Sequence, residues 1–278
     1  SWMRQSHRYL EFPLGLLGAS GKVEYQPKGV VGLISPWNFP INLTFAPLAG
    51  IFAAGNRAMV KPSEFTPATS DLLAKLIGQT FNEDELYVVT GDANVGAAFA
   101  SLPFDHLLFT GSTSVGRDVM RAAAKNLVPL TLELGGKSPV IVSGSADVTK
   151  AAKAIMHGKT FNAGQICVCP DYVLLKEEQK NDFIKAAEAA VDKMFASGLK
   201  HNDDYTSVLG RRHSDRMKNY IKDARSKGAT IFELNPKNED FSQQSNHKIP
   251  PTLIVGVSDD MMVMQEEIFG PLLPIRYI

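Results

Sequence analysis

Two cysteines separated by a single residue have the clearest potential for chemistry in this sequence. Cys167 and Cys169 are the only cysteines among 278 residues, and both lie in the stretch 161–170. A deprotonated thiol is a nucleophile, and Pro170 stops a regular helix or strand ladder from running on past the pair. The Gly-Gln step before Cys167 is expected to leave room for a substrate. The stretch therefore fits a reactive thiol, although a free cysteine is also often a small buried apolar residue.

The attack of a thiolate on a carbonyl needs further groups, which other parts of the sequence could supply. Asn38 offers an amide of the kind that donates to an oxyanion. Glu133 stands near the end of an apolar run that predicts a buried strand, and two glycines follow it. Burial would raise the pKa of this carboxyl and suit it as a general base for water. The alternative for Glu133 is a buried ion pair with Lys137 or another cation.

A regular alternation of strands and helices is expected to position these groups. Apolar, β-rich runs occur at 30–34, 58–61, 86–90, 107–110 and 130–134, and helical patterns separate them at 42–54, 68–78, 96–101 and 115–126. This alternation predicts βαβ units and a parallel sheet. After about residue 140 the pattern loosens into helices at 148–161, 177–196 and 214–227 with strands at 172–175, 230–233 and 252–257.

Polar and small residues follow each predicted strand of the first half. In parallel sheets, ligands bind beyond the carboxyl ends of the strands. Lys61 and Glu64 are three residues apart, a spacing at which both could address the hydroxyls of one ribose. Gly111 and Gly116 bracket a turn that opens a helix, where backbone N–H groups can receive a phosphate, although the Gly-x-Gly-x-x-Gly fingerprint is absent. From the residues alone, the chain is predicted to be a nucleotide-binding α/β enzyme with a candidate thiol nucleophile.

Composition narrows the classes of partner and location. Lys plus Arg and Asp plus Glu both number 29, so no basic surface is expected for nucleic acid or anionic membranes. The longest apolar run, at 45–54, is too short to span a bilayer and contains Pro47 and Gly50. Two cysteines make no disulfide framework, and the six histidines are scattered. The sequence predicts a cytoplasmic protein with no metal site.

Six short motifs follow one another along the chain. They are Pro36-Trp-Asn-Phe-Pro40, Lys61-Pro-Ser-Glu64, Phe109-Thr-Gly-Ser-Thr113, Leu132-Glu-Leu-Gly-Gly-Lys-Ser-Pro139, Phe161-Asn-Ala-Gly-Gln-Ile-Cys167 and Glu266-Glu-Ile-Phe-Gly-Pro271. Together they resemble the ordered signature set of the NAD(P)-dependent aldehyde dehydrogenase superfamily. Residues 23–36 and 61–69 are most similar to the coniferyl-aldehyde dehydrogenase branch. The resemblance implies a Rossmann-like, parallel-sheet cofactor domain followed by an α/β catalytic domain.

The resemblance also implies a role for each site residue. Cys167 would be the nucleophile, Asn38 with the Cys167 backbone N–H would form the oxyanion hole, and Glu133 would activate water to hydrolyse a thioester. NAD would accept a hydride, and Glu64 favours NAD over NADP because a carboxylate repels a 2′-phosphate. The implied cofactor contacts are Ile34, Ser35, Pro36, Trp37, Lys61, Ser63, Glu64, Gly91, Gly111, Ser112, Val115, Leu134, Glu267 and Phe269. Among these, Lys61 and Glu64 would hold the adenosine ribose, and Glu267 and Phe269 the nicotinamide ribose.

The domain organisation that the resemblance implies is incomplete relative to the family. Residues 1–10 and 29–135 would form part of the NAD-binding domain, 11–28 an oligomerisation arm, and 136–278 part of the catalytic domain. Family members carry further segments at both ends, so the chain is expected to be truncated, and the full-length protein is expected to be a homodimer or homotetramer. Two alternatives stay open: a CoA-acylating aldehyde dehydrogenase, which would not need Glu133 as a base, and a non-catalytic fragment that binds NAD or oligomerises.

Overall fold

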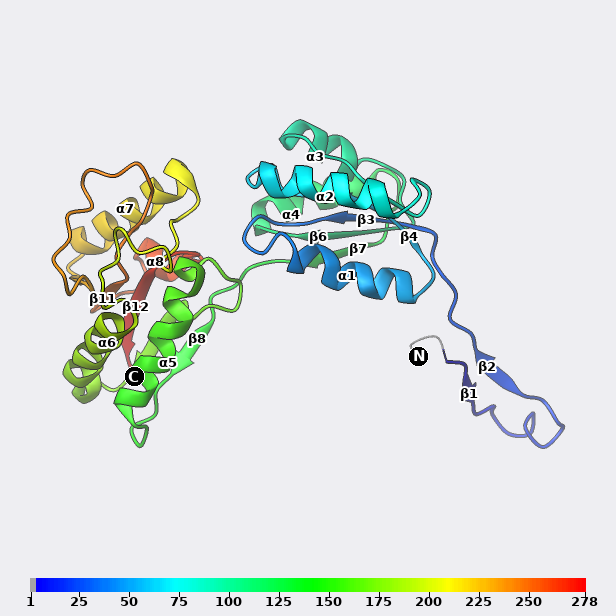
Figure 1. Cartoon of the computed structure of the whole chain (residues 1–278). Helices are drawn as coiled ribbons and strands as arrows, with labels where there is room; N and C mark the ends of the chain where they lie inside the picture. The colour runs from blue at the N-terminus through cyan, green and yellow to red at the C-terminus, as the bar shows by residue number, and fades with distance from the viewer. Residues whose placement is uncertain (1–3) are drawn as a thin grey trace. The chain divides into compact units, whose positions relative to one another are not determined.

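The computed structural model describes residues 4–278, which divide into two compact units between Leu134 and Gly135 (Figure 1). Each unit contains its own five-stranded sheet. Residues 1–3, which belong to the first predicted segment of the NAD-binding domain, lie outside the described part. Within residues 4–278, no helix is long and apolar enough to cross a bilayer.

A two-stranded antiparallel ribbon precedes the first five-stranded sheet. It consists of β1 (Ser6–Arg8) and β2 (Gly21–Val23). The segment that joins the two strands exposes several large apolar side chains, among them Tyr9, Phe12 and Leu16. The assignment of residues 11–28 to an oligomerisation arm stays a prediction.

The sheet of the first unit is entirely parallel, as the alternation of strands and helices predicts. Its strands are β3 (Val30–Ile34), β4 (Arg57–Lys61), β5 (Leu86–Val88), β6 (His106–Thr110) and β7 (Leu130–Glu133), in the spatial order β5-β4-β3-β6-β7. The chain therefore starts at the centre, adds two strands on one side, and returns to add two on the other. In sheets wound in this way, ligands bind where the winding reverses, at the carboxyl ends of β3 and β6.

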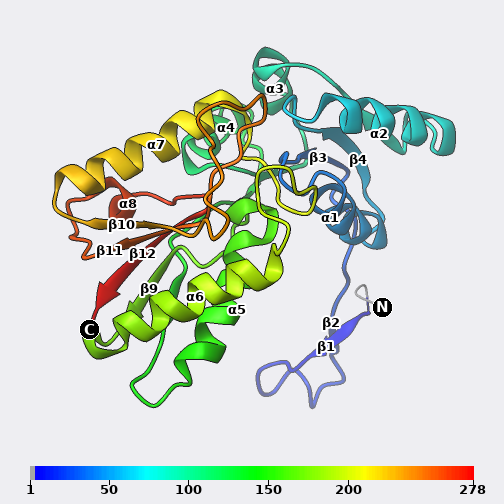
Figure 2. The ribbon, with the colours of Figure 1, turned by 60° about the vertical axis from the view of Figure 1, so that its left-hand side comes forward.

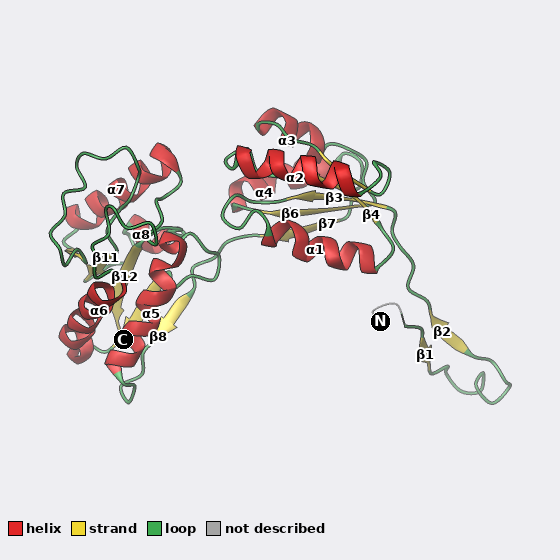
Figure 3. Ribbon diagram, viewed as in Figure 1, coloured by secondary structure: helices red, strands yellow, loops and turns green. Residues whose placement is uncertain are grey.

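Four helices connect these strands and cover both faces of the sheet (Figure 3). They are α1 (Asn42–Ala53), α2 (Pro67–Thr80), α3 (Ala93–Ala100) and α4 (Thr113–Ala124). Leu48 of α1 and Ile77 of α2 pack in one buried cluster, whereas Phe99 of α3 and Val119 of α4 pack in another. Local chemistry sets the helix starts, because Pro67 occupies the first turn of α2 and the Asp92 side chain caps α3.

The second unit has a mixed sheet in the order β10-β11-β12-β9-β8, in which only β10 runs antiparallel to its neighbour. Its strands are β8 (Pro139–Ile141), β9 (Tyr172–Leu175), β10 (Thr230–Glu233), β11 (Thr252–Val255) and β12 (Leu272–Tyr277). Its helices are α5 (Val148–Thr160), α6 (Lys180–Met194), α7 (Gly210–Ser226) and α8 (Met262–Gln265), with 3₁₀ turns η1 (Phe161–Gly164) and η2 (Glu177–Gln179).

Strand β8 and helix α7 are among the elements of this unit that differ from the sequence-based expectation. The three-residue strand β8 was not predicted, because it begins at a proline and is too short to show an alternating pattern. Helix α7 begins at Gly210 rather than at Ser214, because Leu209 before it provides no side-chain cap and therefore no start signal.

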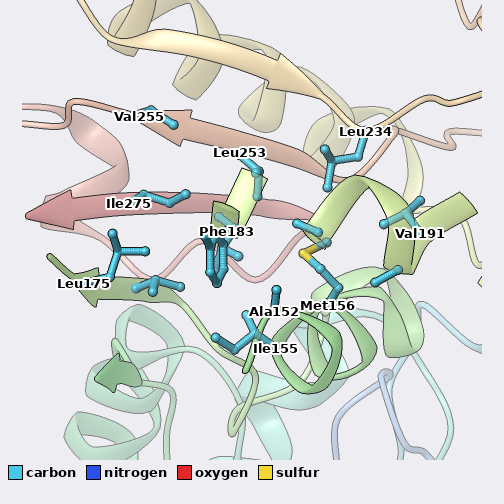
Figure 4. Packing of buried hydrophobic residues seen from close by; sticks show 14 of the residues in the cluster. Ala152, Ile155, Met156, Leu175, Phe183, Val191, Leu234, Leu253, Val255 and Ile275 are labelled. Carbon is cyan, nitrogen blue, oxygen red and sulfur yellow. The ribbon is translucent and has the colours of Figure 1, made fainter. Parts of the chain in front are cut away.

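Helices α5 and α6 lie side by side against the sheet of the second unit (Figure 2). Ala152 and Met156 of α5 and Phe183 and Val191 of α6 are fully buried in one cluster with residues of β9, β11 and β12 (Figure 4). Each large side chain of this kind contributes roughly 1.5–3 kcal/mol by leaving water. This core fixes the end of α5, from which the segment that contains both cysteines begins.

Candidate active site

The carboxyl ends of the strands in the first unit gather the cofactor residues predicted there. Ile34 at the end of β3 is the register partner of both Lys61 in β4 and Phe109 in β6, and Thr110 is the partner of Glu133 in β7. Because these strands are parallel, the segments that follow them leave the sheet at one edge. The structure therefore brings the predicted residues of this unit to one edge of its sheet.

Lys61 and Glu64 form an ion pair at this edge. The Lys61 side chain is 97% removed from solvent and its Nζ lies 2.9 Å from Glu64 Oε2, whereas about a third of the Glu64 side chain stays exposed. Gly96 of α3 flanks the lysine, since a Cβ on this glycine would lie 3.8 Å from Lys61 Cε. A buried cation fixed in this way holds the carboxylate of Glu64 at the surface, where it can accept hydrogen bonds from a ligand.

The predicted phosphate turn opens α4. The Ser112 side chain accepts a hydrogen bond from Val115 N at 3.4 Å, and the Gly111 N–H donates to Glu133 O at 3.0 Å. Val115 is half exposed. The turn is thus joined to the end of β7 by its backbone, and it leaves the N-terminus of a three-turn helix at the surface.

The segment after β3 is held partly inside the first unit. Ser35 is buried, accepts a hydrogen bond from Thr44 Oγ1 at 2.7 Å, and donates its N–H to Lys61 O. Pro36 is buried, whereas Trp37 and Asn38 are half-buried and both contact neighbouring groups. The remaining predicted contacts in this unit are buried Ser63, exposed Gly91 with φ +150°, and half-buried Leu134.

The expectation that Glu133 lies at the end of a buried strand is wrong. Glu133 is exposed, because β7 is an edge strand of the sheet. The Lys137 ammonium binds Asp171 of its own unit. An exposed carboxylate at a strand end has direct access to water.

The segment that leads from α5 to the cysteines has an unusual backbone. Asn162, Ala163 and Gly164 all have positive φ, at 48°, 50° and 74°. Gln165, which is only 1% exposed, donates to Asn162 O at 3.0 Å and to Ser207 O at 3.1 Å, and accepts from Leu209 N at 2.8 Å. Gln165 therefore anchors the segment and does not open space for a substrate, which corrects the expectation for the Gly-Gln step.

The two cysteines differ sharply in their surroundings. Cys167 is exposed, whereas Cys169 is 5% exposed and its thiol lies 3.5 Å from Pro170 O and 3.7 Å from Gly158 O. Burial raises the pKa of the Cys169 thiol, and the neighbouring Lys159 ammonium opposes this effect. Burial also lowers the pKa of Lys159, whose Nζ donates to Pro170 O at 2.9 Å. Cys167 is therefore the accessible thiol of the pair.

Alkylation of the native protein should separate these two thiols. We expect iodoacetamide to modify Cys167 at least about a hundredfold faster than Cys169, because Cys169 is buried and its raised pKa leaves less thiolate at a given pH. Peptide mass spectrometry at increasing times would give both rates, with the unfolded protein as the control in which the rates converge. Similar rates in the native protein would contradict this assignment.

The cysteine segment packs directly against the segment that contains Glu267. A Cβ on Gly164 would collide with the backbone carbonyl of Gly270, so only glycine fits at this position. Phe269 is half-buried and has a left-handed backbone, with φ 49°. The second unit therefore brings the segment with the accessible thiol and the predicted nicotinamide-ribose residues together through backbone contact.

Replacement of Gly164 by alanine should lower the free energy of unfolding by about 2 kcal/mol or more, because both the positive φ and the Gly270 carbonyl oppose a side chain. Gly228→Ala is the matched control. Gly228 also has positive φ, at 94°, but no atom lies within 4 Å of its added Cβ, so its cost should be about 1 kcal/mol. Denaturant unfolding of both variants measures the difference, and equal losses would mean that the contact with Gly270 is not limiting.

Glu267 occupies a confined position in the second unit. The Gly136 N–H binds its carboxylate, and a Cβ on Gly135 would collide with that carboxylate. Burial raises the pKa of Glu267, although the hydrogen bond from Gly136 opposes this effect. Gly135 is thus needed for the close approach of Glu267, whereas Gly136 contributes only its backbone N–H, and a Cβ would fit there. The sequence motif alone did not indicate this difference.

Sequence reasoning missed two residues of this unit that bind the Glu267 segment. Asp171 is 3% exposed and accepts a hydrogen bond from Ile268 N at 2.9 Å, and Arg216 of α7 donates to Ile268 O at 2.8 Å. The only available signal for Asp171 was a carboxylate placed directly before a buried strand. Arg216 had no signal, because it lies among many charged residues of α7.

Each unit, taken by itself, offers polar groups to a ligand. The first unit offers a carboxylate at Glu64, a cation at Lys61 and exposed N–H groups at the start of α4, which suit one ribose and a phosphate. The second unit contains a carboxylate at Glu267, which suits a ribose.

The chain matches the model of the aldehyde dehydrogenase family over residues 4–278. A probable coniferyl aldehyde dehydrogenase of Caulobacter vibrioides is 62% identical over 276 residues, which are 99% of this chain and 57% of that relative. Among solved structures, the substrate-bound state of AldH from Staphylococcus aureus has a TM-score of 0.89 at 38% identity, over 100% of this chain and 58% of that one. An aldehyde dehydrogenase of Mycobacterium tuberculosis complexed with NAD+ has a TM-score of 0.85 at 30% identity, over 99% of this chain and 56% of that one.

These matches confirm the resemblance carried by the six motifs and the predicted α/β fold. The chain spans just over half the length of the relatives it matches. Because the family model extends over every residue that the structure describes, the chain belongs to the aldehyde dehydrogenase family.

Proposed function

We propose that the full-length protein oxidises an aldehyde to the carboxylic acid with NAD, and that the aldehyde is aromatic and similar to coniferyl aldehyde. One observation carries this proposal: Cys167 is exposed on a segment whose neighbours, Gln165 and Cys169, are buried and held by hydrogen bonds. A thiol presented from a fixed backbone can approach a substrate carbon without ordering a loop at each turnover. The 62% identity to a probable coniferyl aldehyde dehydrogenase supports the substrate class.

The first half of the proposed reaction occurs at the Cys167 sulfur. The thiolate forms a C–S bond with the aldehyde carbon while the carbonyl π-electrons move to oxygen, which gives a thiohemiacetal oxyanion. The Asn38 amide and the Cys167 backbone N–H donate hydrogen bonds to this oxygen. NAD held by Glu64 and Glu267 would supply the hydride acceptor, so that the aldehyde carbon bound to Cys167 would lose its hydride and remain as a thioester.

The second half of the reaction regenerates the thiol. The Glu133 carboxylate takes a proton from water while the water oxygen attacks the thioester carbon. The C–S bond then breaks, the carboxylic acid leaves, and the proton returns to the sulfur or to solvent. The exposed position of Glu133 at the end of β7 supports a role that needs contact with water.

The preference for NAD follows from Glu64. Its carboxylate can accept hydrogen bonds from the 2′- and 3′-hydroxyls of the adenosine ribose, while the buried Lys61 holds it in place. A 2′-phosphate at the same position would meet a negative charge. Ile34, Ser35, Pro36, Trp37, Ser63, Gly91, Gly111, Ser112, Val115 and Leu134 complete the proposed contacts of the first unit, and Glu267 and Phe269 hold the nicotinamide ribose.

We further propose that the full-length protein is a cytoplasmic homodimer or homotetramer. The exposed apolar residues between β1 and β2, including Phe12 and Leu16, support association with a second copy. The two free cysteines support a reducing compartment.

The test is an assay of NADH formation by the full-length protein. Coniferyl aldehyde and an aliphatic aldehyde of similar size are each offered with NAD or NADP, and with or without CoA. We expect coniferyl aldehyde with NAD to be oxidised fastest, with no requirement for CoA. Turnover that depends on CoA would replace this function with CoA acylation, and NAD binding without oxidation of any aldehyde would leave a non-catalytic role.

A further inference from the structure

A largely buried ion pair in the second unit has no part in the proposed chemistry. It joins the Lys137 ammonium to the Asp171 carboxylate, and their side chains are only 19% and 5% exposed. Lys137 follows the two glycines that contact Glu267, and Asp171 follows the cysteine segment. The pair therefore connects three sequence regions that the proposed function uses.

Every hydrogen bond recorded for the Lys137 ammonium ends on Asp171 or on the backbone around α8. In addition to Asp171, the ammonium donates to Val263 O at 2.7 Å and to Glu266 O at 3.0 Å. Asp171 uses its other carboxylate oxygen, Oδ1, to accept from Ile268 N at 2.9 Å. The pair thus binds the backbone of Glu266 and of Ile268, the two residues on either side of Glu267.

Helix α7 holds the same segment from another side. Arg216 donates to Ile268 O at 2.8 Å, and the Tyr220 hydroxyl donates to Glu266 Oε2 at 2.8 Å. Burial and, to a smaller extent, the hydrogen bond to Glu266 raise the pKa of Tyr220 to about 12, so this hydroxyl keeps its proton at physiological pH. The main chain of residues 266–268 is therefore fixed while the Glu267 side chain lies against Gly135 and Gly136.

We infer that Lys137 and Asp171 are positioning residues, which hold the Glu267 carboxylate at the place from which it binds the nicotinamide ribose. This inference rests on the proposed function of Glu267. Loss of the ammonium would leave Asp171 buried without its counter-charge and would release two carbonyls of the segment. The adenosine half of the cofactor uses residues of the first unit, so the pair should affect only the nicotinamide half.

The test compares the binding of NAD with that of AMP, which contains only the adenosine half, to full-length Lys137→Met by calorimetry. We expect the Kd for NAD to rise about tenfold or more and the Kd for AMP to stay within about twofold. In turnover, the KM for NAD should rise by a similar factor. Lys137→Arg should lose less affinity for NAD than Lys137→Met does. Arginine keeps the positive charge, but a guanidinium does not reproduce the compact geometry of an ammonium that donates to three acceptors.

Two further variants separate positioning from a general loss of structure. Lys237→Met is the control, because it removes another lysine–aspartate pair of the same unit. Lys237 Nζ lies 2.9 Å from Asp192 Oδ1, and both side chains are far more exposed than those of Lys137 and Asp171. Loss of this pair should change neither the Kd for NAD nor the Kd for AMP. Asp171→Asn combined with Lys137→Met should cost less than the sum of the single variants, because no unpaired charge stays buried. Thermal unfolding of each variant reports whether it is folded.

The possible outcomes are distinct. A folded Lys137→Met protein with unchanged Kd for NAD, or with equal losses of NAD and AMP, overturns the positioning role. If Lys137→Met does not fold, the same comparison on Lys137→Arg decides, and equal losses there also overturn it. The binding measurements need no aldehyde. If Lys137→Met shows the NAD-specific loss while the wild-type protein oxidises no aldehyde, the result contradicts the proposed function and not the positioning role.

Discussion

Full-length protein with Cys167 replaced by alanine should lose aldehyde oxidation by a factor of at least about 10⁴, because no other described thiol is accessible to form the thiohemiacetal. Its affinity for NAD should be retained, since Cys167 is not among the proposed contacts to either ribose, which are Lys61, Glu64, Glu267 and Phe269. Steady-state NADH formation measures the first effect and calorimetry with NAD the second. Because the side chain of residue 167 is exposed, the variant should unfold at nearly the same temperature as the wild type.

Cys169→Ala is the matched control for this experiment. Cys169 lies two residues away in the same segment, but it is buried against backbone carbonyls and is not available to a substrate. We expect this variant to keep its turnover within several-fold and to lose about 1 kcal/mol of stability through the cavity. Normal turnover by Cys167→Ala would refute the assignment of the nucleophile, and loss of turnover in Cys169→Ala alone would move it to Cys169.

Glu133→Gln should lower steady-state turnover by a factor of about 10²–10⁴, the range that general base catalysis supplies. Hydride transfer precedes the step that needs this base, so a single equivalent of NADH per active site should still form rapidly when enzyme and aldehyde are mixed. Stopped-flow absorbance would show this burst followed by a slow phase. The thioester should then be detectable on Cys167 by intact mass spectrometry.

Another exposed glutamate of the first unit provides the control. Glu83 is exposed and lies in the same unit outside the proposed site, so Glu83→Gln should show no change. Addition of CoA to Glu133→Gln tests the alternative chemistry, because a thiol can attack the thioester without a base of this kind. If wild-type turnover itself needs CoA and Glu133→Gln matches it, hydrolysis is not the physiological second step.

Much of the fold was predictable because the apolar runs of the first unit are short, regularly spaced and separated by good helix signals. Strands β3 and β4 therefore appear within one residue of their predicted bounds. The exposure of Glu133 was not predictable from the same pattern. It depends on β7 being an edge strand, and the spatial order of strands is decided by packing that a local apolar run does not encode.

In the candidate site too, contacts between residues close in the sequence were predictable, whereas contacts between distant residues were not. Lys61 and Glu64 are three residues apart, so their ion pair could be read from spacing. Lys137 and Asp171 are 34 residues apart and meet only because β8 and β9 pair in the sheet. Their interaction required the fold, and the motif around Lys137 offered Glu133 as an equally plausible partner.

The hydrogen bonds of Gln165 determine how the conformation of the cysteine segment depends on pH and salt. Its side-chain amide bonds to backbone groups of Asn162, Ser207 and Leu209, and these backbone groups neither gain nor lose a proton. Neither acid nor salt weakens a neutral, buried contact of this kind as it would an exposed ion pair. These contacts of the segment that carries Cys167 should therefore stay in place when pH or ionic strength changes.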